Sequence, residues 1–137
     1  MKIMCDTNVI IDVSLEREPS VEDSYKNLKF CEEHKIDGFV SVSLVTDIFC
    51  LVRKYTHSTE QTYKAVGKLL KIDKVCSITN NDVLIAFQKK TKDFEDCLVA
   101  TCTKSIHCDY IATRNKRGFK GFGIPVLTPT EILLKIL

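Results

Sequence analysis

Short apolar runs alternate with longer stretches of helical periodicity along almost the whole chain of 137 residues. Each run has the length of a short strand, and the stretch after it carries apolar residues at i, i+3 and i+4 spacing, as amphipathic helices do. Strands that alternate with helices form parallel sheets with helices on both faces. The pattern therefore predicts an α/β fold, a three-layer sandwich with a central parallel sheet, and a single domain over residues 1–137.

The boundaries of the expected elements follow from these periodicities and from cap and turn residues. Strands are predicted at Lys2–Cys5, Phe39–Val42, Val75–Ile78, Asp109–Thr113 and Pro125–Leu127. Helices are predicted at Val21–Lys35, Ser43–Tyr55, Ser58–Ile72, from Asn80 or Asn81 to Lys90, at Asp93–Ser105 and from Thr128 onward. We find no linker, internal repeat or second domain in the sequence.

The composition is that of a globular protein, with 45% hydrophobic and 28% charged residues, and it excludes a disordered chain. No stretch approaches the roughly 18–20 apolar residues that cross a bilayer. The N-terminal segment reaches the carboxylate of Asp6 too early for the apolar stretch of a signal peptide. We therefore expect a soluble, cytoplasmic protein without a membrane partner.

Seven cysteines stand along the chain without any Cys-x-x-Cys pair, which argues against a disulfide scaffold and against a zinc ribbon. Most lie inside apolar runs, as Cys50 does, and are expected to act as small core side chains in a reducing compartment. Cys102, His107 and Cys108 could be metal ligands, but they lack a fourth ligand and such a grouping is more often coincidental.

Acidic residues occupy positions where a parallel sheet gathers function, at and near the carboxyl ends of its strands. Asp6 directly follows the first predicted strand. Asp47 shares a helical face with apolar residues, where an ionised carboxylate is costly unless it is paired or bound to a metal. Asp93 and Asp96 are three residues apart and hence on one face of a helix. By contrast, Asp12 is interpreted as a surface or turn acid.

Each acid also has a purely structural interpretation. Asp6 could cap a turn, Asp93 could be a helix N-cap, and Asp96 could complement a helix dipole. Taken together, however, Asp6, Asp47 and Asp96 indicate a carboxylate cluster, which needs a cation. Oxygen ligands select Mg²⁺ or Mn²⁺ over zinc, and such an ion activates water against a phosphodiester. The acids therefore predict phosphodiester hydrolysis.

The charge distribution is uneven although the net charge is only +2. Residues 1–50 hold ten acidic and five basic side chains, and residues 51–137 hold eight acidic and fifteen basic ones. The densest basic run is Arg114–Lys120. It is either a solvated loop or a patch that contacts phosphates.

Three segments of the chain resemble those of the PIN domain family, the metal-dependent ribonuclease fold of VapC-type toxins. They are Ile3–Asp12, Asp93–Leu98 and Asp109–Asn115, and the resemblance extends over essentially the whole chain. It implies a sheet of about five strands in the order 3-2-1-4-5, flanked by helices, with acids gathered in a cleft. It further implies an endoribonuclease that is the toxin of a toxin–antitoxin pair, inhibited by an antitoxin protein and commonly a homodimer.

Carried over by motif, the resemblance makes Asp6, Asp96 and Asp47 the metal ligands. Asp93 is a neighbouring catalytic acid, and Thr7, Asn8 and Asn115 support the ligands. The RNA substrate would be held by four cations at the rim of the cleft, namely Arg114, Lys116, Arg117 and Lys120.

The chain departs from the family pattern at two positions, and the second departure is the main support for an alternative. Asp47 stands where the family usually has Glu, and Gly118 stands where related sequences often have a further acid. The alternative is a catalytically weakened PIN-fold module that binds RNA or another protein. A receiver-type phosphoacceptor domain is less favoured, because it would have a paired acid at the first strand and a lysine after the last.

Overall fold

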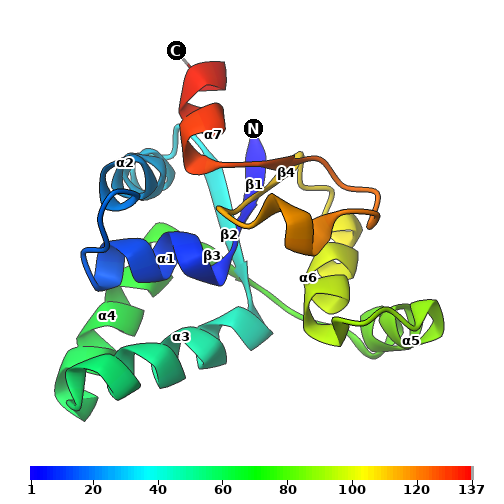
Figure 1. Ribbon diagram of the computed structural model, residues 1–137, viewed down its shortest axis with the longest axis horizontal. Helices are drawn as coiled ribbons and strands as arrows, with labels where there is room; N and C mark the ends of the chain where they lie inside the picture. Colours follow the sequence, from blue (N-terminus) through cyan, green and yellow to red (C-terminus); the bar gives the residue numbers. More distant parts are fainter. Residues whose placement is uncertain (137) are drawn as a thin grey trace.

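The computed structural model describes residues 1–136, and Figure 1 shows how its elements are arranged. The strands are β1 (Lys2–Cys5), β2 (Asp37–Ser41), β3 (Lys74–Cys76), β4 (Tyr110–Ala112) and β5 (Val126–Leu127). The α-helices are α1 (Thr7–Ser14), α2 (Val21–Glu32), α3 (Val42–Thr56), α4 (Thr59–Ile72), α5 (Asn80–Lys89), α6 (Phe94–Ser105) and α7 (Pro129–Ile136). A short 3-10 helix, η1 (Lys116–Phe119), lies between β4 and β5.

The five strands form one parallel sheet in the order β3-β2-β1-β4-β5, which confirms the predicted architecture and strand order. Helices α1 to α4 pack together on one side of it, with α7 against α2, and α5 and α6 pack on the other (Figure 1). β1 lies in the middle, between β2 and β4. The register pairs Cys5 with Ala112, so the residues that follow these two strands emerge side by side at one edge of the sheet.

Helix α1 is not among the predicted elements. Its sequence is rich in β-branched residues, which favour strands, and it follows β1 with a single residue between them. Tertiary packing overrides this preference, because Val9, Ile10 and Ile11 are buried and the helix packs against α2 and α3. The N-cap of α1 is Asp6, whose carboxylate accepts the Thr7 N–H.

Two further local predictions are corrected by the structure. The sequence predicts Asn80 or Asn81 as the N-cap of α5, but the N-cap is Thr79, which forms a capping box with Asp82. The basic run Arg114–Lys120, interpreted from the sequence as a solvated loop or a phosphate-contacting patch, contains the short helix η1, and Phe119 of this helix is buried.

The apolar core lies on both faces of the sheet and includes six of the cysteines, as predicted for most of them. Cys50 is the exception and is exposed. The buried residues of α3 are Leu44, Ile48 and Val52, spaced four apart, and Cys50 lies on the opposite side of that helix. None of the helices within residues 1–136 has the length and apolar content needed to span a bilayer.

Candidate active site

Asp6 lies at the carboxyl end of the central strand β1, and its carboxylate is held by three donors. Oδ1 accepts the Thr7 N–H at 2.8 Å. Oδ2 accepts the hydroxyl of Thr113 at 2.7 Å and the side-chain amide of Asn8 at 3.3 Å. Burial raises the pKa of Asp6, while the hydrogen bonds from Thr113 and Thr7 lower it. The carboxylate is therefore fixed in orientation and half-buried.

Thr113 joins the segment after β4 to the segment after β1. Its hydroxyl accepts the Asn8 side-chain amide at 2.9 Å and the Asn115 N–H at 3.0 Å while it donates to Asp6. Asn8 Oδ1 in turn accepts the Arg114 N–H at 3.1 Å. The side chain of Asn8 and the backbones of Thr7 and Asn115 thus take part in one hydrogen-bond network around Asp6.

The first turn of α6 brings more acids to the same edge of the sheet. Asp93 is the N-cap of α6, and its Oδ1 accepts the Asp96 N–H at 3.0 Å. Burial and repulsion from Asp93 and Asp6 raise the pKa of Asp96 to about 6. The charge of Asp93 also raises the pKa of Asp6. Asp6 is therefore close enough to Asp93 and Asp96 for the three carboxylates to repel one another, although Asp6 is far from the other two in the sequence.

Gly118 lies against these groups. A Cβ at this position would be 2.9 Å from Asp96 Oδ2 and 3.0 Å from Asn115 Nδ2. The side chains of Asp96 and Asn115 therefore converge on the space that a larger residue at position 118 would occupy. Gly118 thus has no acidic side chain, and η1 lies close to the carboxylate of Asp96 at this position.

Asp47 joins the acids through Glu95, a residue the sequence analysis missed. A hydrogen bond to Asp47, burial and repulsion from Asp47, Asp93 and Asp96 raise the pKa of Glu95 to about 7. The half-buried Asp47 on α3 thus lies next to Glu95 in the first turn of α6. The acids form a series of neighbouring pairs. Within residues 1–136 no three of these carboxylates have oxygens that all lie within 4.8 Å of one another.

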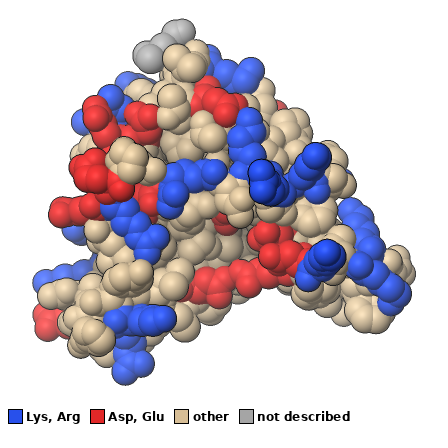
Figure 2. All heavy atoms as spheres, in the orientation of Figure 1, with Lys and Arg blue, Asp and Glu red and all other residues tan. Residues whose placement is uncertain are grey.

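Figure 2 shows a band of acidic side chains across the hollow between α3 and the start of α6, with basic side chains to its sides. In the part of the chain that the structure describes, none of Asp6, Asp47, Asp93, Glu95 and Asp96 forms an ion pair with lysine or arginine. The cluster therefore has an uncompensated negative charge, and its ligand atoms are carboxylate oxygens. These two properties fit a hard divalent cation such as Mg²⁺ or Mn²⁺.

The four predicted RNA-binding cations differ in their surroundings. Arg114 donates two hydrogen bonds to the carboxylate of Asp12, from Nε to Oδ2 at 2.6 Å and from Nη2 to Oδ1 at 2.9 Å. The interpretation of Asp12 as a surface acid is wrong, because it is fully buried at this pair. Lys116 pairs with Glu131 at 3.0 Å. Arg117 and Lys120 are exposed and have no ion pair among the described residues.

Residues 2–117 match the family model of the PIN domain. The chain belongs to the PIN domain family. The three segments that resemble this family in the sequence all fall within the matched stretch, and they supply Asp6, the acids of α6 and the Thr113–Asn115 segment. The resemblance stated from the sequence is thereby confirmed.

This PIN domain is similar to several proteins of known name. It is 25% identical over 135 residues to Ribonuclease VapC1 of Aquifex aeolicus (strain VF5), covering 95% of this chain and 92% of that protein. Its fold matches a chain of VapBC2 from Rickettsia felis, bound to a promoter DNA fragment, with a TM-score of 0.71 at 15% identity, covering 93% and 98% of the two chains. A toxin–antitoxin complex from Klebsiella pneumoniae matches with a TM-score of 0.67 at 19% identity, covering 93% and 97%.

Sequence reasoning missed Thr113 and Glu95 as site residues of this PIN domain. Thr113 follows the fourth predicted strand directly, and its place beside Asp6 required the pairing of β1 with β4. Glu95 lies between Asp93 and Asp96 in the sequence, but its contact with Asp47 depends on how α3 and α6 are placed. Both residues lie within segments that resemble the PIN family, and this position could have indicated their place in the site.

Proposed function

We propose that this PIN domain is a Mg²⁺- or Mn²⁺-dependent endoribonuclease and the toxin of a toxin–antitoxin pair. The observation that carries the proposal is the group of carboxylates from β1, α3 and α6, which gathers at one edge of the sheet without a cationic partner. The similarity to Ribonuclease VapC1 supports RNA as the substrate.

In this proposal Asp6 and Asp96 are direct metal ligands, and Asp47 is a ligand that reaches the ion through a water molecule. A bound divalent ion would polarise the phosphodiester and lower the pKa of a bound water. Asp93 holds Asp96 in position as the cap of α6 and adds negative charge. Thr113 and Asn8 orient Asp6, and Asn115 lies beside Asp96.

The proposed partners are an antitoxin protein and a second copy of the chain, and the proposed setting is the cytoplasm. The antitoxin is supported by the similarity to the toxin–antitoxin complex from Klebsiella pneumoniae. The seven free cysteines are consistent with a reducing compartment.

Removing divalent metal is expected to abolish RNA cleavage, because the clustered carboxylates need a cation to approach a phosphate. A mixed RNA pool incubated with the purified protein should be cut in Mg²⁺ or Mn²⁺, remain intact in EDTA, and be cut again when metal is added back. Gel analysis of the pool measures the effect. Cleavage that continues in EDTA would contradict the proposal.

The alternative is a catalytically weakened module that binds RNA or another protein. It is favoured by Gly118, which stands where a further acid would lie and leaves no room for a side chain beside Asp96. It predicts RNA binding without cleavage in either metal. The same gel experiment, combined with a filter-binding assay, separates the two functions.

Removing the charges of Arg117 and Lys120 is expected to weaken RNA binding and its dependence on salt. Each phosphate contact to single-stranded RNA contributes about 0.7 to the slope of log K against log salt, so losing two should reduce the slope by about 1.4. The test is RNA binding by Arg117→Gln/Lys120→Gln in an Asp96→Asn background, which keeps the RNA intact. Lys64→Gln/Lys68→Gln on α4 is the matched control, and an equal effect in that control would refute the assignment.

A further inference from the structure

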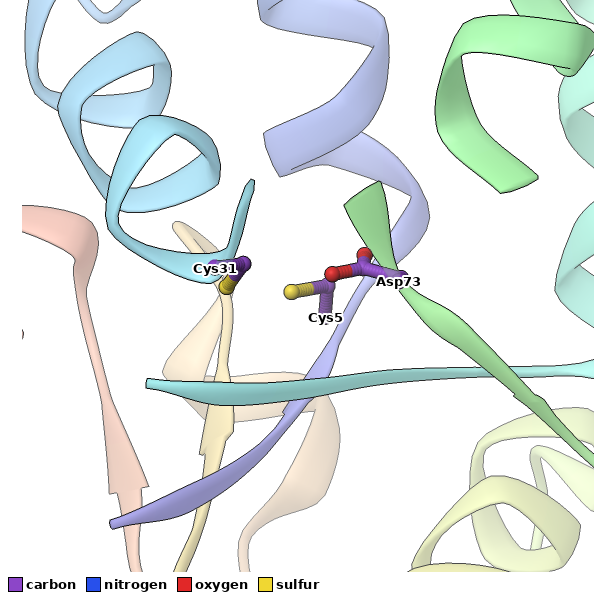
Figure 3. Close-up of side chains that lie close together, drawn as sticks. All are labelled: Cys5, Cys31 and Asp73. Carbon is purple, nitrogen blue, oxygen red and sulfur yellow. The ribbon is translucent and has the colours of Figure 1, made fainter. Parts of the chain in front are cut away.

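A second group of side chains that could hold a metal ion lies outside the group of acids described above. It consists of Cys5 at the end of β1, Cys31 on α2 and Asp73 between α4 and β3, and we name it the thiol–carboxylate cluster. Figure 3 shows the three side chains pointing toward one another from these three elements. One ligand atom from each residue lies within 4.8 Å of the other two.

The thiol–carboxylate cluster is removed from solvent. The exposed fractions of Cys5, Cys31 and Asp73 are 0%, 2% and 3%. Both carboxylate oxygens of Asp73 are buried and have no hydrogen-bond partner among the described residues. A buried, unpartnered carboxylate is costly, because it has lost its hydration without gaining a donor or a cation. Burial raises the pKa of Asp73 to about 6, and the neighbouring thiols of Cys5 and Cys31 offset this effect only in part.

Gly38 on β2 provides the space in which these side chains meet. A Cβ at this position would be 2.2 Å from Asp73 Oδ1 and 2.7 Å from Cys31 Sγ, distances at which neither group could stay in place. The absence of a side chain at position 38 therefore lets the carboxylate and the thiol approach the same point.

A cavity of about 320 Å³ leads from the surface to the cluster. Cys31 and Asp73 are among its lining residues, together with Gly38 and His34. The cavity borders two of the three ligand residues, and it gives a small ion a route toward them.

We propose that Cys5, Cys31 and Asp73 form a binding site for a soft or borderline divalent cation, with Zn²⁺ as the expected ion. Two thiolates and one carboxylate are a ligand set that zinc accepts and that Mg²⁺ does not favour. Ligand atoms around tetrahedral zinc lie about 3.5–3.8 Å apart, so small side-chain rotations close the observed spacing. A water molecule that enters through the cavity would supply the fourth ligand. Binding forms two Zn–S bonds and one Zn–O bond, and the two thiols release their protons to solvent.

The site shares no ligand with the proposed nuclease centre, although Cys5 directly precedes Asp6 in the chain. The test uses the full-length protein, freed of metal by a chelator and titrated with Co²⁺, whose bonds to thiolates give charge-transfer absorption in the near ultraviolet. We expect this absorption to saturate at one equivalent and to disappear when Zn²⁺ displaces Co²⁺. Co²⁺ held by the carboxylates of the nuclease centre would give no such band, and Asp6→Asn should therefore retain it.

Cys31→Ser is expected to lose the thiolate absorption, while Cys50→Ser, which changes an exposed cysteine outside the cluster, should keep it. Asp73→Asn retains both thiols and should weaken Zn²⁺ binding by more than about tenfold, since losing even an indirect partner of a metal ligand costs about that much. Far-ultraviolet circular dichroism checks that each variant folds.

A measurement on the unchanged protein covers the case in which the variants fail to fold. Zn²⁺ should raise the melting temperature of the metal-free wild type and of Asp6→Asn equally, because the ion binds the folded state. Absence of a thiolate band in the wild type, its persistence in a folded Cys31→Ser, or a melting temperature unchanged by Zn²⁺ would overturn the proposal and identify the cluster as a contact between protonated groups.

Discussion

Replacing Asp6 or Asp96 by Asn is expected to reduce RNA cleavage by more than about 100-fold. Each substitution removes a negative charge that the proposed metal ion needs while leaving the size of the side chain unchanged. Changes to groups that only support metal ligands already cost about 10–100-fold, so loss of a direct ligand should cost more. The expected result is an almost complete loss of cleavage in Mg²⁺ and in Mn²⁺.

The cleavage rates of the two variants should be compared with that of Asp37→Asn, an exposed acid at the amino-terminal end of β2 and therefore at the opposite edge of the sheet. Melting temperatures near that of the wild type would show that the variants fold. Wild-type cleavage by both folded variants would refute the assignment of the metal ligands, and a loss confined to Asp6→Asn would leave Asp96 without its proposed role.

Replacing Arg114 by Ala is expected to destabilise the fold by about 3 kcal/mol. Asp12 is 0% exposed, and the guanidinium of Arg114 bonds to both of its oxygens. Removing one partner of a buried ion pair leaves the other charge uncompensated, which costs about 3–5 kcal/mol. The lower end of this range is expected, because the side chain of Arg114 is 39% exposed.

Urea unfolding of Arg114→Ala and of Arg117→Ala measures this difference directly. Arg117 is exposed and has no ion pair within residues 1–136, so its loss should leave the free energy of unfolding nearly unchanged. Adding Asp12→Asn to Arg114→Ala should recover part of the stability, because it removes the unpaired charge. Equal stability of the two single variants would show that the pair contributes nothing.

The sheet could be predicted from the sequence because strand pattern and strand order depend on local periodicity and on family-wide motifs. Helix α1 could not, since its β-branched residues favour a strand and only packing against α2 and α3 makes it a helix. The prediction that Cys50 lies in the core was wrong for a related reason. An apolar run does not reveal which side of a helix faces the core.

The candidate site was predictable where a residue follows a strand or caps a helix, as Asp6 and Asp93 do. The link between Asp47 and Glu95, and the burial of Asp12 against Arg114, depend on contacts between residues far apart in the chain. No spacing rule reports such contacts. The same holds for the thiol–carboxylate cluster, whose members come from β1, α2 and the junction of α4 with β3.

The buried pair of Asp12 and Arg114 constrains how homologous sequences can diverge. A fully buried carboxylate is destabilising when its cationic partner is lost. Lysine cannot replace Arg114, because a single ammonium group cannot reproduce the bidentate geometry of the guanidinium. Homologues are therefore expected to exchange positions 12 and 114 jointly. A neutral side chain at one position should coincide with a neutral side chain at the other, and an alignment of close homologues would reveal this as covariation.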